Sequence, residues 1–220
     1  MRPRVNVRDA EATSASCSLD EGFPRQVVDT STAYLARVGY EVLTVGPSRE
    51  PVVSIGGLRI RPDLALGALR PEDSSLLILP GADLWTRTSA SPVAAGTDAL
   101  APFARAARAF LDAGVPVAAI CGATAGLARE GLLDDRAHTS ASPYYLAAAS
   151  DCAGADRYAE ADAVTDGLLI TAGPTEPVAF AREVFRLLGV YEGEVLDAWY
   201  RLYHDSDAEA YSVLQKAHAA

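Results

Sequence analysis

The sequence predicts an α/β fold in which a mostly parallel sheet has helices on both faces. Two observations carry this prediction. Short apolar runs alternate along the chain with longer segments of helical periodicity, and this alternation is typical of βαβ units. The apolar runs are also continuous, as expected for strands that are covered on both faces. Right-handed crossovers then place helices on each side of the sheet.

The expected elements follow one another at regular intervals. The expected strands lie at residues 41–46, 76–79, 115–120 and 168–171. The expected helices lie at residues 26–38, 98–113, 122–132, 177–188 and 192–217. Residues 52–55 and 58–60 flank Gly56-Gly57 and predict a β-hairpin at the edge of the sheet, because two glycines favour a tight turn. The small, polar residues 86–96 predict a mobile loop.

The two ends of the chain differ from its centre. Within the first 25 residues only Val5-Asn6-Val7 offers an opening strand, and the rest of that stretch gives no clear element. Residues 190–220 predict a helical extension at the C-terminus. A length of 220 residues suits one α/β domain better than two, so we expect residues 1–220 to form a single domain.

The composition excludes several classes of protein. A formal net charge of −10 argues against nucleic acid and anionic membranes as partners. No apolar run approaches the ~20 residues of a membrane span, and no secretory signal is visible. The three cysteines, Cys17, Cys121 and Cys152, are far apart and form no CxxC pair, so we expect no disulfide framework and no metal site. GxGxxG and P-loop motifs are missing, so we expect no cofactor. These features predict a cytoplasmic protein.

The leading candidate for a functional residue is Cys121. The apolar run 115–120 leads directly into it, and the small residues Gly122, Ala123 and Gly126 follow. This is the layout of a nucleophile elbow, where small neighbours permit a sharp strand-to-helix turn. The thiol is then expected at the carboxyl end of a strand, where open α/β sheets bind ligands. Helix N–H groups there favour a thiolate. A buried structural cysteine is the alternative.

Other residues are expected to converge on this thiol. The N–H of Gly122 is placed to donate to an oxyanion. The strand at 76–79 ends beside the elbow, so the N–H of Gly81 or of Ala82 is a second expected donor; an ordinary βα turn is the alternative. We expect His138, which follows the elbow helix, to accept the thiol proton or to pair with the thiolate; a structural histidine is the alternative. Cys17 and Cys152 have no such setting and are expected to be bystanders.

At these residues the sequence resembles the DJ-1/PfpI family, with its class I glutamine amidotransferase-like fold. The resemblance covers about residues 26–203. It rests on the turn at Pro80-Gly81, the elbow at residues 119–124, residues 131–134 leading to His138-Thr139-Ser140, and the segments 165–172 and 177–189. Cys-Gly-Ala-Thr and His-Thr-Ser are similar to the bacterial branch described as protease-like or amidotransferase-like.

The resemblance implies a flavodoxin-like three-layer sandwich with a reactive cysteine. Cys121 matches the family nucleophile, Gly81 and Gly122 match its oxyanion donors, and His138 matches the nearby histidine of this branch. The family also carries a glutamate near the start of its first helix, hydrogen-bonded to the cysteine. The corresponding stretch here, about 26–28, holds no carboxylate.

Three acidic residues bear on that missing glutamate. Glu21 precedes Gly22, whose backbone freedom lets the chain turn towards the strand ends. Glu21 is the leading candidate for a substitute acid, followed by Asp20; the alternative is that both are solvated loop charges. Glu176, in the loop after the last strand, is expected to line the same pocket without a catalytic role.

Two functions stay open. The first is a cysteine-dependent hydrolase or lyase that acts on a small electrophilic substrate. The second is a non-catalytic redox-sensing or scaffold protein, because an exposed thiol of low pKa oxidises readily. The oxyanion glycines favour the enzyme, and the missing glutamate favours the sensor. The C-terminal helix, with Trp199, Tyr200 and Tyr203, either supplies a homodimer surface or packs within the chain.

Overall fold

A computed structural model describes residues 4–7, 23–53, 57, 59–82, 85, 100–150 and 152–219. Seven strands form its main sheet, in the order β5-β2-β1-β6-β7-β9-β8. They are β1 (Arg4–Val7), β2 (Glu41–Gly46), β5 (Leu64–Ala65), β6 (Leu76–Leu79), β7 (Val117–Ile120), β8 (Ala163–Asp166) and β9 (Leu169–Ala172). The pairings are parallel except that of β8 with β9. The predicted mostly parallel sheet is confirmed.

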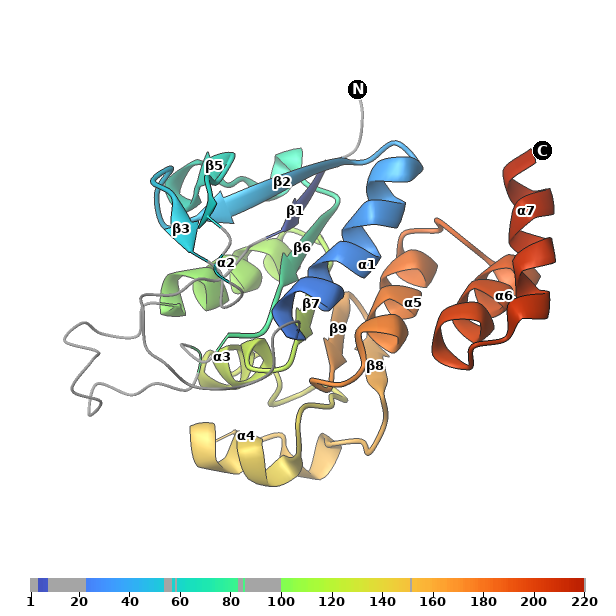
Figure 1. The fold of residues 1–220 in the computed structure, drawn as a ribbon. Coiled ribbons are helices and arrows are strands. Elements are labelled where there is room, and N and C mark those ends of the chain that lie inside the picture. The colour runs from blue at the N-terminus through green and yellow to red at the C-terminus, as the bar shows by residue number, and fades with distance from the viewer. Residues whose placement is uncertain are drawn as a thin grey trace.

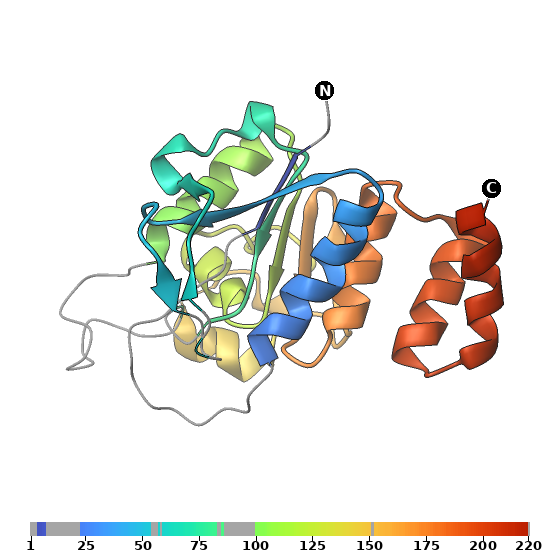
Figure 2. The same cartoon turned by 45° about the horizontal axis from the view of Figure 1, so that its top comes forward.

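Helices cover both faces of this sheet, which makes the molecule a three-layer sandwich (Figures 1 and 2). On one face lie α1 (Phe23–Arg37) and α5 (Pro177–Leu187), with α6 (Gly193–His204) packed on α5. On the other lie α2 (Ala101–Asp112) and α3 (Ala123–Arg129), with α4 (Pro143–Ala149) packed on α3. Successive side chains of β6 point alternately into the two cores. Leu76 and Ile78 pack on the α5 side, whereas Leu77 and Leu79 pack on the α2 side.

The helices form where apolar side chains recur on one face. In α2 the buried residues are Phe103, Ala104, Ala107 and Phe110, which is the spacing of an amphipathic helix packed on a core. Several helices also begin with residues that favour the start of a helix. Proline lies in the first turn of α2, α4 and α5, and the Ser142 hydroxyl caps α4 by accepting from the N–H of Tyr145 at 3.0 Å.

Two sequence predictions need correction. The hairpin forms, with β3 (Val52–Val53) antiparallel to β4 (Arg59–Ile60), but as a separate two-stranded sheet. The two edges of the main sheet are β8 and β5, and β5 occupies the outer side of β2. The helix predicted at 192–217 is also wrong as one element. It divides into α6, a 3-10 turn at Ala208–Ala210 and α7 (Tyr211–Ala219).

The break after α6 has a local cause. Ser206 adopts a left-handed conformation with φ of 59°, which ends the helical hydrogen bonding. The side chain of Asp207 then accepts a hydrogen bond from the N–H of Glu209 and caps the next turn. The extension is therefore a pair of helices beside α5 (Figure 1).

Aromatic side chains attach this extension to the sandwich. Trp199 is fully buried, and its ring meets those of Tyr34 on α1 and Phe185 on α5 at centroid distances of 5.5 and 4.8 Å. The hydroxyls of Tyr34 and Tyr203 are hydrogen-bonded. Trp199 thus packs within the chain, whereas Tyr203 is 45% exposed.

Some sequence predictions lie outside the described residues. They are the loop at 86–96, the acids Asp20 and Glu21, and Cys17. The opening strand predicted at Val5-Asn6-Val7 is confirmed as part of β1, which lies between β2 and β6. Among the described helices, none combines the length and the apolar character that a membrane crossing requires.

Candidate active site around Cys121

Cys121 lies on a strained turn between β7 and α3. Its φ is 57°, in the left-handed region that a side chain disfavours, and such a conformation costs about 1–3 kcal/mol. Hydrogen bonds on both sides hold the turn. The N–H of Cys121 donates to Ala172 O on β9 at 3.1 Å, and its carbonyl accepts from the hydroxyl of Thr124 at 2.7 Å. The sharp strand-to-helix turn predicted from the sequence is therefore present, with a half-buried cysteine at its apex.

The end of β6 lies directly against this cysteine. A β-carbon added to Gly81 would lie 2.7 Å from Cys121 Cβ and 3.1 Å from its Sγ. Real β-carbons essentially never approach another heavy atom within 3.0 Å. Glycine is therefore required here by close approach, and the structure brings Gly81 and Cys121 together as expected.

Gly122, the residue after Cys121, makes a similar close contact with the loop after β6. A β-carbon on Gly122 would lie 2.7 Å from the carbonyl oxygen of Ala82 and 3.4 Å from its nitrogen. The backbone of Gly122 is ordinary α-helical, with φ of −55° and ψ of −27°. Its glycine is thus needed for space, because the loop after β6 crosses the start of α3 at this point.

Trp85 holds the two loops together, and the sequence analysis did not identify it. The Trp85 ring is fully buried and covers Gly126 so closely that a β-carbon there would lie within 3.0 Å of two ring carbons. Its indole N–H donates to Pro80 O at 3.0 Å. The Arg129 guanidinium donates to the Trp85 carbonyl. A glycine inside a short helix, where alanine is preferred, was the available signal of this contact.

His138 is buried against the segment 157–159 rather than hydrogen-bonded to the thiol. It is 1% exposed, and its Nδ1 lies 2.9 Å from the carbonyl oxygen of Arg136. A carbonyl only accepts, so Nδ1 carries a proton, and in the neutral imidazole Nε2 is then the acceptor. Nε2 has no hydrogen-bond partner among the described residues. The expected pairing of His138 with Cys121 is therefore not formed as a hydrogen bond.

Two hydrogen-bonded hydroxyls nevertheless connect the segment around His138 to the elbow at Cys121. The Thr124 hydroxyl donates to Cys121 O and lies 2.6 Å from the Ser140 hydroxyl, which must then donate to Thr124. The next contact runs to β9, where the N–H of Thr139 donates to the Thr171 hydroxyl at 3.0 Å. The segment 138–140 is thus fixed to the elbow. In the sequence, Thr139 and Ser140 are members of the His138-Thr139-Ser140 motif without an assigned role.

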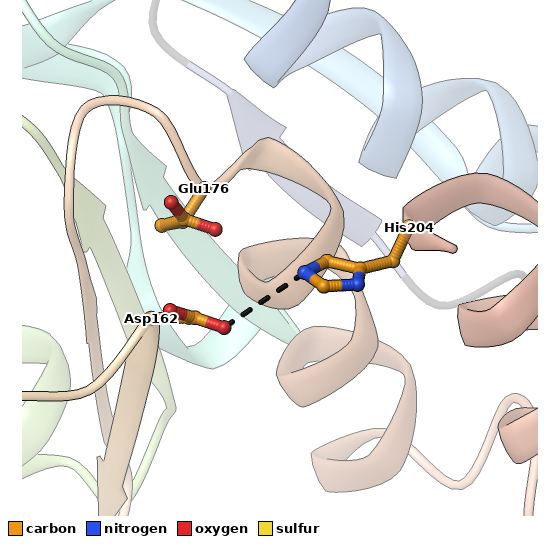
Figure 3. A group of neighbouring side chains, drawn as sticks. All are labelled: Asp162, Glu176 and His204. Carbon is orange, nitrogen blue, oxygen red and sulfur yellow. Dashed lines mark ion pairs between the residues drawn. The ribbon is translucent and has the colours of Figure 1, made fainter. Parts of the chain in front are cut away.

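The acidic residues expected near the thiol lie in different parts of the chain. Glu21 and Asp20 lie outside the described residues. Residues 26–28, where the family glutamate is expected, belong to the first turns of α1. Glu176 is half-buried in the loop between β9 and α5. Its carboxylate accepts from the Thr175 hydroxyl and lies near Asp162 and His204 (Figure 3).

Cys152 differs clearly from Cys121. Burial raises its pKa, and the charge of Asp134, whose carboxylate lies 3.7 Å from the thiol, raises it further. It lies far along the chain from the elbow, in ordinary loop backbone. Neither described cysteine forms a disulfide. These contacts fit the expectation that Cys152 is a bystander.

Known proteins share both the sequence and the fold. The DJ-1/PfpI family profile matches residues 25–187. Two proteins of Bacillus subtilis (strain 168) are similar in sequence. One, named "Uncharacterized protease YoaZ", is 37% identical over 163 residues, covering 74% of this chain and 73% of that protein. The other, "Uncharacterized protease YdeA", is 31% identical over 169 residues, covering 74% and 79%.

Solved structures agree with this assignment. A thiJ/pfpI family protein from Bacillus anthracis is 29% identical with a TM-score of 0.79, covering 98% of this chain and 95% of that one. The DJ-1 superfamily protein Atu0886 from Agrobacterium tumefaciens is 27% identical with a TM-score of 0.74, covering 93% and 98%. With its strained cysteine turn and its flavodoxin-like sandwich, this chain belongs to the DJ-1/PfpI family.

Proposed function

We propose that the protein is a cysteine-dependent hydrolase or lyase that acts on a small electrophile such as a carbonyl or amide compound. The observation that carries the proposal is the left-handed backbone of Cys121 at the apex of the turn. Such strain persists only where surrounding contacts enforce it, and it concentrates at functional sites. The same turn presents the thiol at the carboxyl edge of the sheet, where α/β folds bind ligands.

In this proposal the sulfur of Cys121 attacks the electrophilic carbon. A C–S bond forms, and the electron pair of the carbonyl moves to its oxygen. The N–H groups of Gly122 and Gly81 then stabilise that oxygen. The close approach of Gly81 to Cys121 supports this role, because it places the backbone of the β6 loop beside the sulfur.

We assign His138 the role of base or orienting partner of the thiol. Its Nε2 is an acceptor without a partner among the described residues, and the Thr124–Ser140 pair fixes its segment to the elbow. A rotation of the thiol or a bound substrate is needed to bring the two groups into contact. Glu21 is the proposed source of the remaining carboxylate. The protease names of the Bacillus subtilis relatives support the hydrolase class.

The second candidate is a redox sensor that uses the same thiol. The observation that favours it is the missing hydrogen bond between His138 Nε2 and Cys121, because a hydrolase needs a route for the thiol proton. A sensor needs only an accessible, reactive sulfur that oxidises reversibly to sulfenic acid.

One experiment separates these functions. Wild type, Cys121→Ser and the matched control Cys152→Ser are screened against α-dicarbonyl, amide, peptide and isonitrile substrates. We expect turnover in wild type and in Cys152→Ser but not in Cys121→Ser. Glu21→Gln is expected to reduce turnover about a hundredfold, as for loss of a general acid or base. Turnover that survives Cys121→Ser refutes the cysteine mechanism. Absence of turnover together with stoichiometric peroxide oxidation of Cys121 favours the sensor.

A further inference from the structure

We propose that Asp162, Glu176 and His204 form a binding site for a divalent cation, with Zn²⁺ as the best fit. The site is separate from the proposed thiol chemistry and goes beyond it. Asp162 immediately precedes β8, Glu176 lies between β9 and α5, and His204 is the last residue of α6. One ligand atom from each lies within 4.8 Å of the other two (Figure 3).

The imidazole of His204 is oriented as metal-binding histidines are. Its Nδ1 lies 2.6 Å from the Asp205 carboxylate and therefore carries the proton. The ring stacks on Tyr200 with centroids 4.5 Å apart and planes 18° apart. These contacts leave the Nε2 lone pair facing Asp162, 3.9 Å away (Figure 3). A carboxylate that holds the far nitrogen of a ligating histidine is a common second contact in metal sites.

Among the described residues, neither carboxylate pairs with a lysine or an arginine. Glu176 forms no ion pair there, and Asp162 approaches only His204, at 3.9 Å. The neighbouring Arg182 is directed elsewhere, since it binds Asp197 at 3.4 Å and lies over the Tyr200 ring at 4.6 Å. A bound cation balances the charge of the two carboxylates.

The donor set selects among cations. Imidazole nitrogen with two carboxylate oxygens suits Zn²⁺, whereas Mg²⁺ and Ca²⁺ prefer oxygen ligands alone. Zinc bonds of about 2.1 Å place tetrahedral ligand atoms about 3.4 Å apart, so the three groups must close by roughly 1 Å. They are free to do so, because His204 and Asp162 are 36% and 56% exposed. Three protein ligands leave a fourth position for water.

A cation in this site connects the C-terminal helices to the edge of the sheet that carries the thiol. The carbonyl of Asp162 accepts from Gly173, which follows β9. The preceding residue of β9, Ala172, accepts from the N–H of Cys121. The expected effect of the ion is therefore to stabilise the attachment of α6.

Zinc titration of the full-length chain tests the site. The background is Cys17→Ser/Cys121→Ser/Cys152→Ser, which removes thiol ligands, and circular dichroism confirms folding of each variant. We expect one Zn²⁺ per chain by calorimetry and metal analysis. Affinity should fall at least tenfold in His204→Ala and in Asp162→Asn, and about 10–100-fold in Asp205→Asn. The matched carboxylate control, Glu194→Gln on the exposed start of α6, should bind as the background does.

Two further measurements make the result decisive. Co²⁺ should give the intense visible bands of a tetrahedral site, without thiolate charge transfer, and these should vanish in His204→Ala. Zn²⁺ should raise the thermal midpoint of the background but not that of Asp162→Asn. Zinc binding that is absent from the background, or equal in Asp162→Asn and Glu194→Gln, overturns the proposal. If His204→Ala fails to fold, Asp162→Asn decides the question.

Discussion

Replacing Gly81 by alanine tests how closely the end of β6 approaches the thiol. The new methyl group would lie 2.7 Å from Cys121 Cβ. That carbon cannot move away easily, because hydrogen bonds to Ala172 and Thr124 hold the Cys121 backbone. Overpacking of this kind costs about 1–3 kcal/mol. Alanine regains about 0.4–1 kcal/mol by restricting the unfolded chain, since Gly81 lies outside the left-handed region. The net expectation is a destabilisation of about 1–2 kcal/mol.

The assay combines stability with thiol chemistry. Urea denaturation should show a lower midpoint for Gly81→Ala at an unchanged slope. Alkylation of Cys121 should slow, because the methyl group lies 3.1 Å from the sulfur and shields it. The matched control is Gly67→Ala, where an added β-carbon meets no atom within 4 Å and φ is not left-handed. Its stability should change by less than about 0.5 kcal/mol.

One result would contradict the close approach of Gly81 to Cys121. If Gly81→Ala is as stable as Gly67→Ala, and Cys121 is alkylated at the wild-type rate, then β6 does not end against the thiol. The proposed oxyanion role of Gly81 falls with that contact.

Three further predictions concern the surroundings of the elbow. Gly126→Ala should lower the free energy of unfolding, measured by urea denaturation, by about 1–2 kcal/mol, because the clash with the buried Trp85 ring outweighs the ~1 kcal/mol gain in helix propensity. A variant more stable than wild type would contradict this packing. Thr124→Val keeps the shape but leaves the buried Ser140 hydroxyl without its acceptor, so unfolding free energy should fall by about 1–3 kcal/mol; no change would mean that the pair is dispensable. Because the pKa of Cys152 is raised, its alkylation should begin only at a higher pH than that of a small-molecule thiol. If mass spectrometry shows that Cys152 and a small-molecule thiol are alkylated at equal rates at neutral pH, the pKa of Cys152 is not raised.

The parallel sheet was predictable because its signal is local. Leu76–Leu79 is apolar at every position, and the structure sends alternate residues into the two cores. The antiparallel strand β8 escaped prediction because all four of its residues are only half-buried, and its sequence gives no apolar run. The short α4 escaped for a similar reason. Only Leu146 in it is buried, so no helical periodicity was visible.

The break between α6 and α7 shows a different limit. It depends on Ser206 in the left-handed region and on the cap by Asp207, without a glycine or proline at either position. The apolar pattern continues through it, so one long helix was the natural expectation. The break decides where His204 lies, as the last residue of α6.

The candidate site likewise has one part that was predictable from the sequence and one part that was not. The elbow at Cys121 is encoded by consecutive residues, and its position at the end of β7 follows from the strand before it. Contacts through space were not predictable. Trp85 reaches Gly126 from a distant loop, and the Nδ1–H of His138 donates a hydrogen bond to the Arg136 carbonyl. Loop geometry sets both contacts, and one sequence carries no periodic signal for them.

The most direct test of the account is the pH dependence of alkylation at each cysteine, followed by mass spectrometry of the native protein. Cys121 should react first, at a pH below the ~8.5 of an ordinary thiol, because the N–H groups at the start of α3 are expected to stabilise its thiolate. Cys152 should react only at higher pH. A Cys121 profile that matches an ordinary thiol, or that lags behind Cys152, would contradict the claim that this turn holds the reactive centre.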